Sequence, residues 1–282
     1  MESRNRVATE LVDEAIDFAD ELGIVIHHLD NDAVVLDFGV DARGGIEAGL
    51  LLTEIATGGL ATVQTRLTDM AGAAVPTIEL TTDHPSLALH ASQLADWPLE
   101  GRDGRGYGPA NLFTDARQAA TGYVEEFDFA VLAIEADALP DERLAGSVAS
   151  SAGVGTSGVF LPTASAASVA GSVSILAEAA GRVLSALDDL DYDLSSVIAT
   201  TGSAPMMPLA GDGKTARDRA DLAIAKAGRA HLVLAEPLDD NRALEERIGD
   251  PDLPAAVTID VMDGPTHAFG EPDESTLADF FD

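Results

Sequence analysis

The segment GSVSILAEAAGRVLSAL, residues 171–187, carries one carboxylate and one cation among small and aliphatic residues. Glu178 precedes Arg182 by four residues, so on a helix the two side chains share a face and attract each other. Such a pair is either an ordinary stabilising pair on a helix surface or an acid–base site, in which the cation keeps a buried carboxylate ionised. The segment alone does not decide between these two interpretations.

A second carboxylate, Glu135, interrupts the apolar run AVLAIEAD. The run predicts a buried strand, in which an unpaired charge is costly. Glu135 is therefore expected either at the exposed end of the strand or beside a partner that compensates its charge.

Other segments match functional motifs only in part, because the elements or residues around them do not fit. GVGTSG at 153–158 has the spacing of a dinucleotide fingerprint, but it follows a predicted helix and precedes a predicted strand, the reverse of the order that such a site needs. GDGKT at 211–215 resembles the end of a phosphate loop, yet Pro208 stands in the place of the first glycine, and a plain turn is predicted at Lys214. The six histidines show no metal spacing, and the sequence has no cysteine and no G-x-S-x-G elbow.

The strongly negative net charge indicates a cell with a high salt concentration rather than a particular ligand. The formal net charge of the 282 residues is −33, and only two of the cations are lysines. Such a surface repels nucleic acid and acidic membranes, and it suits molar salt, where the Debye length falls to ~3 Å. With no run of about 20 apolar residues and no signal-peptide core at the N-terminus, we expect a cytoplasmic protein of a halophile.

Helical and strand-like patterns alternate along the chain. Helices are expected at 3–22, after the glycines at 44–45, and at 85–97, 139–153, 171–187 and 217–228, and strands at 23–29, 33–40, 60–67, 76–83, 128–137, 159–163, 195–205, 230–236 and 250–262. The segment 98–108 is expected to be a loop. With 46% hydrophobic residues the chain can bury a real core, and the alternation predicts the α/β class, with α+β elements arranged in layers.

Several ordered segments together resemble one family, the methenyltetrahydromethanopterin cyclohydrolases. The segments are DFGVDARGGIEAGLLLTEIATGGLA (37–61), TTDHPSLALHASQLADW (81–97), AVLAIEADALPDE (130–142), FLPTASAASVAGSV (160–173) and TTGSAPMMPLAGD (200–212). The likeness runs from about residue 3 to 235 and agrees in order and spacing, so this chain is identified as a divergent, halophilic-archaeal member.

The resemblance implies two α/β domains with a cleft between them, assembled as a homotrimer. We place the domains at 1–125 and 126–282, with the option that they exchange segments. Water would add to the cationic methenyl carbon of a tetrahydropterin, and the adduct would collapse to the formyl derivative, with no metal and no cofactor. The substrate would be a derivative of tetrahydromethanopterin or of tetrahydrofolate.

The resemblance also assigns residues, and here the chain departs from the family. Glu135 matches a strand glutamate and is expected to bind the pterin. The family places an arginine and, three residues later, a glutamate on the helix after the GSV segment, but these positions hold Glu178 and Gly181. Two further positions expected in the cleft also differ from the family, because Leu94 and Asn111 stand where it has basic residues. The matching segments add these expected substrate-binding residues: Gly58, Gly59, Ser92, Gln93, Thr163, Ser172 and Arg219.

Three hypotheses stay open at this point. In the first, the protein is a cyclohydrolase with a swapped pair, in which Glu178 is the base and Arg182 its cation. In the second, it is an inactive or retuned paralogue that binds a pterin-like ligand without hydrating it. In the third, another carboxylate (Asp37, Glu54 or Glu178 unaided) acts on a different substrate.

Overall fold

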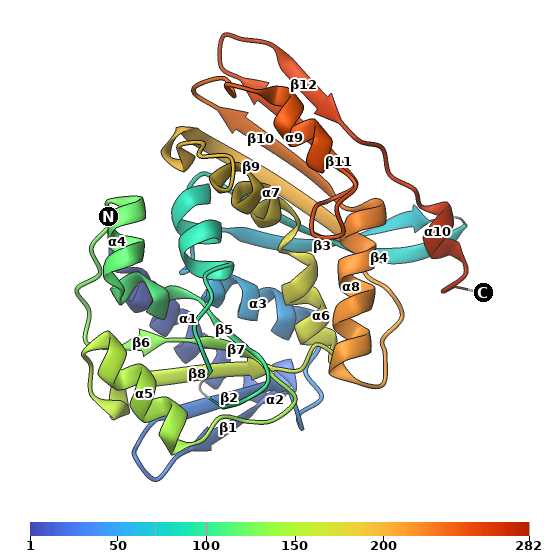
Figure 1. The fold of residues 1–282 in the computed structure, drawn as a ribbon. Helices are drawn as coiled ribbons and strands as arrows, with labels where there is room; N and C mark the ends of the chain where they lie inside the picture. The colour runs from blue at the N-terminus through green and yellow to red at the C-terminus, as the bar shows by residue number, and fades with distance from the viewer. Residues whose placement is uncertain (71, 100, 282) are drawn as a thin grey trace.

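Two six-stranded sheets with helices packed between them make up the chain (Figure 1). They are seen in a computed structural model that describes residues 1–70, 72–99 and 101–281. Each sheet mixes parallel and antiparallel neighbours. The α/β class that the alternating pattern predicted is confirmed, in the form of a mixed α/β protein with two mixed sheets.

The first sheet holds the strand that carries Glu135. Its strands are β1 (Val25–His28), β2 (Val34–Gly39), β5 (Arg105–Tyr107), β6 (Ala130–Val131), β7 (Ala133–Glu135) and β8 (Val159–Ala164). They run in the order β1-β2-β8-β7-β5, and β6 pairs with β8. The short strand β5 lies within the segment expected to be a loop, and it pairs antiparallel with β7 so that Arg105 stands opposite Glu135.

The second sheet has the order β12-β11-β10-β9-β4-β3. Its strands are β3 (Thr62–Met70), β4 (Ala73–Thr82), β9 (Val197–Pro205), β10 (Arg229–Leu234), β11 (Ala256–Val261) and β12 (Thr266–Phe269). Each sheet thus takes strands from both sides of residue 125, because the β3–β4 hairpin joins the later strands and β6 to β8 join the earlier ones. The domain ranges 1–125 and 126–282 stay a prediction.

Helices fill the space between the sheets (Figure 1). The helices are α1 (Arg4–Asp17), α2 (Ala19–Leu22), α3 (Ile46–Ala56), α4 (Asp115–Thr121), α5 (Glu142–Ala152), α6 (Val169–Leu176), α7 (Ala179–Asp188), α8 (Gly213–Ala227), α9 (Asn241–Arg247) and α10 (Ser275–Ala278), with a π-helical segment η1 (Ser86–Gln93) and the 3₁₀ turns η2 (Pro109–Phe113), η3 (Thr156–Gly158) and η4 (Leu194–Ser196). GDGKT opens α8 rather than forming a plain turn, because Asp212 caps the helix by accepting the N–H of Thr215.

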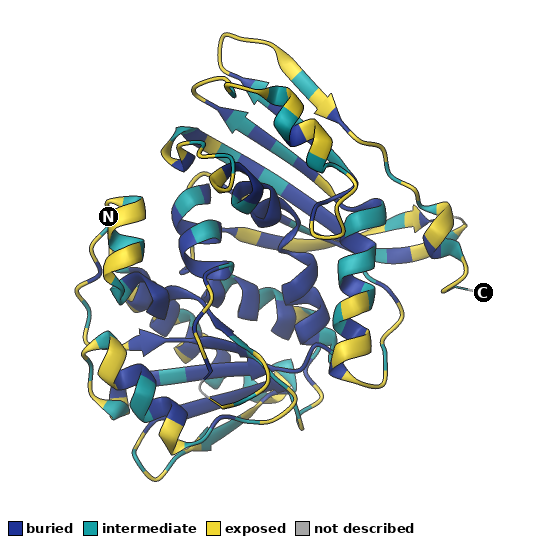
Figure 2. Ribbon diagram, in the orientation of Figure 1, coloured by how far each residue is buried: buried dark blue, intermediate teal, exposed yellow. Residues whose placement is uncertain are grey.

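Small residues let these layers approach closely. Apolar side chains of α6, α7 and α8 pack on the second sheet, and those of α1 and α3 pack on the first. A Cβ at Gly49 would lie 2.6 Å from Cβ of Val173 on α6, and one at Gly202 would lie 2.6 Å from the backbone of Ala180 on α7. Figure 2 shows that the helices between the sheets are largely buried, whereas exposed residues gather on the outer helices and on the turn between β11 and β12.

The helix expected at 171–187 is two helices. α6 and α7 meet at an angle of 43°, and at the junction the N–H of Glu178 donates to Ile175 three residues back instead of four. This tightened turn changes the direction of the chain without glycine or proline. In the described part of the chain, no single helix is long and apolar enough to cross a membrane, and this bent pair passes that test only by combined length and composition.

Candidate active site

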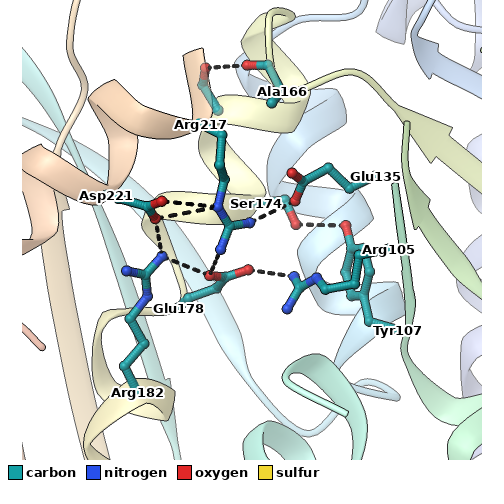
Figure 3. A network of polar contacts seen from close by, with 10 residues as sticks. Arg105, Tyr107, Glu135, Ala166, Ser174, Glu178, Arg182, Arg217 and Asp221 are labelled. Atoms are coloured by element: carbon teal, nitrogen blue, oxygen red, sulfur yellow. Dashed lines mark hydrogen bonds and ion pairs between the residues drawn. The ribbon is translucent and has the colours of Figure 1, made fainter. Parts of the chain in front are cut away.

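Glu178 lies at the junction of α6 and α7 and is the hub of a buried ion network (Figure 3). Its side chain is 1% exposed. Its Oε1 accepts from Nη2 of Arg105 at 2.5 Å, and its Oε2 accepts from Nη2 of Arg182 and Nη2 of Arg217, each at 3.0 Å. The i,i+4 pair seen in the sequence is therefore present, and it is buried rather than on a helix surface.

Arg217, on α8, connects this hub to Glu135. Its Nη1 donates to Oε2 of Glu135 at 2.7 Å, while its Nη2 holds Glu178 (Figure 3). Asp221, one turn along α8, lies 3.3 Å from Nε of Arg217 and accepts from Arg182 at 2.5 Å. Three arginines and three carboxylates from four parts of the chain thus neutralise one another, which is the condition for burying charge.

The strand β5 supports the network from the other side. Arg105 stacks over the ring of Tyr107, with its Cζ 4.7 Å from the ring centroid. The Tyr107 hydroxyl lies 3.0 Å from Oγ of Ser174 on α6, close enough for a hydrogen bond. Burial raises the pKa of Tyr107 to about 12, so the phenol stays neutral.

The two glutamates differ sharply in acidity. Burial alone would raise the pKa of Glu178, but attraction to Arg105, Arg217 and Arg182 outweighs it and lowers the pKa to about 2. For Glu135, burial dominates and raises the pKa, with the Glu178 charge acting in the same direction and Arg217 opposing it. Glu178 therefore keeps its charge at neutral pH, whereas the carboxyl of Glu135 has a pKa above its ordinary value and binds a proton more readily.

A cavity of about 780 Å³ opens beside Glu135. Its wall includes both acidic and basic side chains: Arg102, Asp103, Glu135, Asp137, Lys214, Arg217 and Asp218. On the other side of the network, a hollow of about 300 Å³ is lined by Leu94, Arg105, Glu178 and Arg182, and Arg217 lines both spaces. The ion network therefore forms a partition between the two.

The structure brings Glu178, Arg182 and Glu135 into one network, and it places the other expected binding residues elsewhere. Gly58 and Gly59 form the turn after α3, against side chains of α1. Ser92 donates to the carbonyl of Ala56, and Thr163 to that of Leu161.

Gln93, Ser172 and Arg219 also lie away from the network. The Gln93 side chain is fully buried, and neither of its amide atoms has a partner among the described residues. Ser172 and Arg219 share a hollow of about 10 Å³, where Arg219 donates to the carbonyls of Pro208 and Leu209.

The other carboxylates considered from the sequence are separate as well. Asp37 is fully buried and accepts the N–H groups of residues 39–42. Glu54 lines a different hollow, of about 250 Å³, with Phe18 and Val63. Within the described ranges, no three side chains of His, Asp or Glu are grouped so as to hold a metal ion.

The sequence interpretation missed Arg105, Arg217 and Asp221. A signal for two of them was present, since Arg217 and Asp221 are four residues apart and flank the apolar stripe of Ala216, Ala220 and Ile224 on α8. Arg105 had no such signal, because its role depends on a three-residue strand inside a glycine-rich segment.

Comparisons with known proteins agree with the resemblance found in the sequence. The family model described as "Cyclohydrolase (MCH)" matches residues 3–249. The chain is 42% identical to the methenyltetrahydromethanopterin cyclohydrolase of Halobacterium salinarum, over all of this chain and 99% of that protein. It is 33% identical to the enzyme of the same name from Methanococcoides burtonii (85% and 78% covered) and 38% identical to that from Methanocella arvoryzae (77% and 70% covered).

Proposed function

Because this chain belongs to the methenyltetrahydromethanopterin cyclohydrolase family, we propose that it hydrolyses the cationic methenyl group of tetrahydromethanopterin to the formyl derivative. The observation that carries this proposal is the 42% identity to the Halobacterium salinarum protein over the full length of both chains. The chain belongs to the family that its ordered segments predicted. Arg182, Glu178 and Glu135 meet in one site beside a cavity, which is compatible with chemistry there.

We place the substrate in the cavity beside Glu135. The cavity is large enough for a bicyclic ligand with part of its side chain, and pockets of this size are usual for small molecules. Its wall carries four carboxylates (Asp103, Glu135, Asp137 and Asp218) and three cations (Arg102, Lys214 and Arg217), so groups of both signs can contact a polar heterocycle. Lys214 pairs with Asp218, and Arg217 pairs with Glu135.

The hydration of the methenyl group needs only a few contributions from the protein. The amidinium carbon is already electrophilic, so the site has to orient water, accept its proton and exclude competing reactions. Pterin binding by Glu135, which the resemblance implies, and acid–base work by Glu178 with Arg182, which is the swapped-pair hypothesis, both stay hypotheses. The cleft between two domains and the homotrimer are also proposals. Light scattering in molar KCl would test the homotrimer.

The second candidate function is a pterin-binding paralogue without hydrolytic activity. It is favoured by one observation, the replacement of the family's arginine and glutamate by Glu178 and Gly181. It requires that the cavity still bind the heterocycle.

One experiment separates the two candidates. Loss of the methenyl absorbance is followed with methenyl-tetrahydromethanopterin and, in parallel, methenyl-tetrahydrofolate, in molar KCl with and without the protein. Turnover above the uncatalysed rate supports the cyclohydrolase, and the faster substrate identifies the carrier. Binding of the methenyl compound in equilibrium dialysis without turnover would establish the paralogue instead.

A further inference from the structure

Glu178 and Glu135 differ in how accessible their carboxylate oxygens are to a water molecule. Both oxygens of Glu178 accept from guanidinium groups, and its side chain is 1% exposed. The side chain of Glu135 is 18% exposed and lines the 780 Å³ cavity. Its Oε2 is held by Arg217, and among the described residues no donor contacts its Oε1. Of these two glutamates, only Glu135 therefore presents an uncommitted carboxylate oxygen to the cavity.

Arg217 holds one oxygen of Glu135 and leaves the other free, so the residue meets the geometric requirement for a base as well as for binding. A carboxylate that recognises the aminopyrimidinone edge of a pterin accepts two parallel N–H bonds, one on each oxygen. In Glu135 one of these oxygens already accepts a short bond from Arg217, at 2.7 Å. One free oxygen is what contact with a water molecule and transfer of its proton require.

We propose, on the basis of the proposed function, that Glu135 is the general base of the hydration and that Glu178 is a positioning residue that acts through Arg217. The water oxygen forms a bond to the methenyl carbon, the π pair of the C=N bond moves to nitrogen, and Oε1 of Glu135 takes the proton. In the collapse, the C–N bond breaks with its pair on nitrogen, nitrogen gains a proton from Glu135 and the hydroxyl loses its proton to solvent. One proton is released for each turnover.

Glu178 acts because a guanidinium is a planar fork with fixed geometry. With Nη2 of Arg217 held by Glu178, Nη1 points at Oε2 of Glu135 and leaves Oε1 to the cavity. Several charged and titratable groups act on Glu135 or line the cavity with it. They are Arg105 and Tyr107 on β5, Lys214, Arg217 and Asp218 on α8, Glu178 at the α6–α7 junction, Arg102 and Asp103 before β5, and Asp137 after β7. Of these, Glu178 holds the pKa of Glu135 up, and Arg217 and Arg105 hold it down.

The test compares Glu135→Gln, Glu178→Gln and Glu54→Gln in the full chain, with kcat and KM measured across pH in molar KCl. Glu54 is a matched control, because burial also raises the pKa of its carboxyl but it lines a different hollow. Loss of the base should lower kcat of Glu135→Gln by about 10²–10⁴-fold, with a much smaller change in KM. Glu54→Gln should retain both constants.

The pH profile distinguishes a base from a positioning residue. The acidic limb of kcat in the natural protein should disappear in Glu135→Gln. In Glu178→Gln it should persist and move to lower pH, because a negative charge that raises the pKa of Glu135 has been removed. A role for Glu178 in folding alone would leave the limb where it is.

Three results would overturn the proposal. One is an unchanged kcat with a raised KM in Glu135→Gln, which would make Glu135 a binding residue only. Another is loss of the acidic limb in folded Glu178→Gln, which would make Glu178 the base. The third is absence of turnover by the natural protein, which removes the proposed function and this inference together, whereas the first two leave the function intact. Circular dichroism checks the fold of each variant. If Glu178→Gln does not fold, the kcat, KM and pH profile of Glu135→Gln still decide whether Glu135 is the base.

Discussion

The side chain of Leu94 occupies the space that a side chain at position 181 would need. Cδ1 of Leu94 lies 2.7 Å from the position of a Cβ on Gly181, closer than real Cβ contacts. The resemblance seen in the sequence implies a basic residue at position 94 and a glutamate at position 181, so by that comparison both positions depart from the family. The two departures therefore fit each other physically, because the aliphatic side chain fills the volume that the glycine leaves.

Restoring the family glutamate alone should therefore damage the protein. We expect Gly181→Glu to lower the free energy of unfolding by about 1–3 kcal/mol, the usual cost of overpacking, and Leu94→Ala in the same chain to recover part of that loss. Gly146→Glu on α5 is the control, since a Cβ there meets open space. Urea unfolding in molar KCl measures all four chains, and equal losses at 181 and 146 would contradict the steric explanation.

Removing the charge of Glu178 should destabilise the fold strongly. Glu178→Gln leaves Arg105, Arg182 and Arg217 with less compensating charge in a buried place, which typically costs about 3–5 kcal/mol. Adding Arg105→Gln removes one of the uncompensated cations, so the double variant should be more stable than the sum of the two single losses predicts. Thermal unfolding of the three variants gives this coupling energy.

The control for that series is Glu246→Gln. Glu246 also forms an i,i+4 pair, with Arg242, but both side chains are largely exposed. Its replacement should leave the stability nearly unchanged. A loss at Glu246 as large as that at Glu178 would show that burial is not the cause.

Stability should also fall in acid because of Glu178. Its pKa is lowered from an ordinary value of 4.5 to about 2 in the fold, so the folded state binds a proton less readily than the unfolded chain. The stabilisation is then complete above about pH 5, and it is lost as the pH falls through 4.5 toward 2. The difference in unfolding free energy between the natural protein and Glu178→Gln, measured from pH 7 to pH 3, should shrink with decreasing pH. A constant difference would contradict the assignment of that pKa.

The local features of the site could be predicted from the sequence, and its long-range contacts could not. Spacing alone predicted that Glu178 and Arg182 would lie on one face, and the apolar run around Glu135 indicated a charge in need of a partner. That partner, Arg217, is 82 residues away, and no local pattern joins two such segments. The same limit applies to the β3–β4 hairpin, whose place in the second sheet depends on pairing with β9.

The break between α6 and α7 was missed for a different reason. The segment has neither glycine nor proline between residues 175 and 180, where the junction lies, so propensity predicts one continuous helix there. Tertiary interactions override that preference. The three arginines that converge on Glu178 come from β5, α7 and α8, and the bend directs Glu178 toward them.

Asp37 is a further carboxylate for which a catalytic role was considered, and its contacts predict a structural one. Its two oxygens accept the N–H groups of Gly39, Val40, Asp41 and Ala42 at 2.6–3.0 Å, which fixes the turn after β2. Asp37→Asn replaces one acceptor oxygen by an NH₂ group that faces these donors. We expect the free energy of unfolding to fall by about 2–3 kcal/mol, the cost of buried donors left unsatisfied.

The value of kcat per folded molecule should stay unchanged, because Asp37 lines neither the cavity nor the hollow beside Glu178. Asp41→Asn, with an exposed side chain in the same turn, is the matched control. A folded Asp37→Asn protein with a kcat reduced 100-fold would instead restore Asp37 as a candidate for the chemistry.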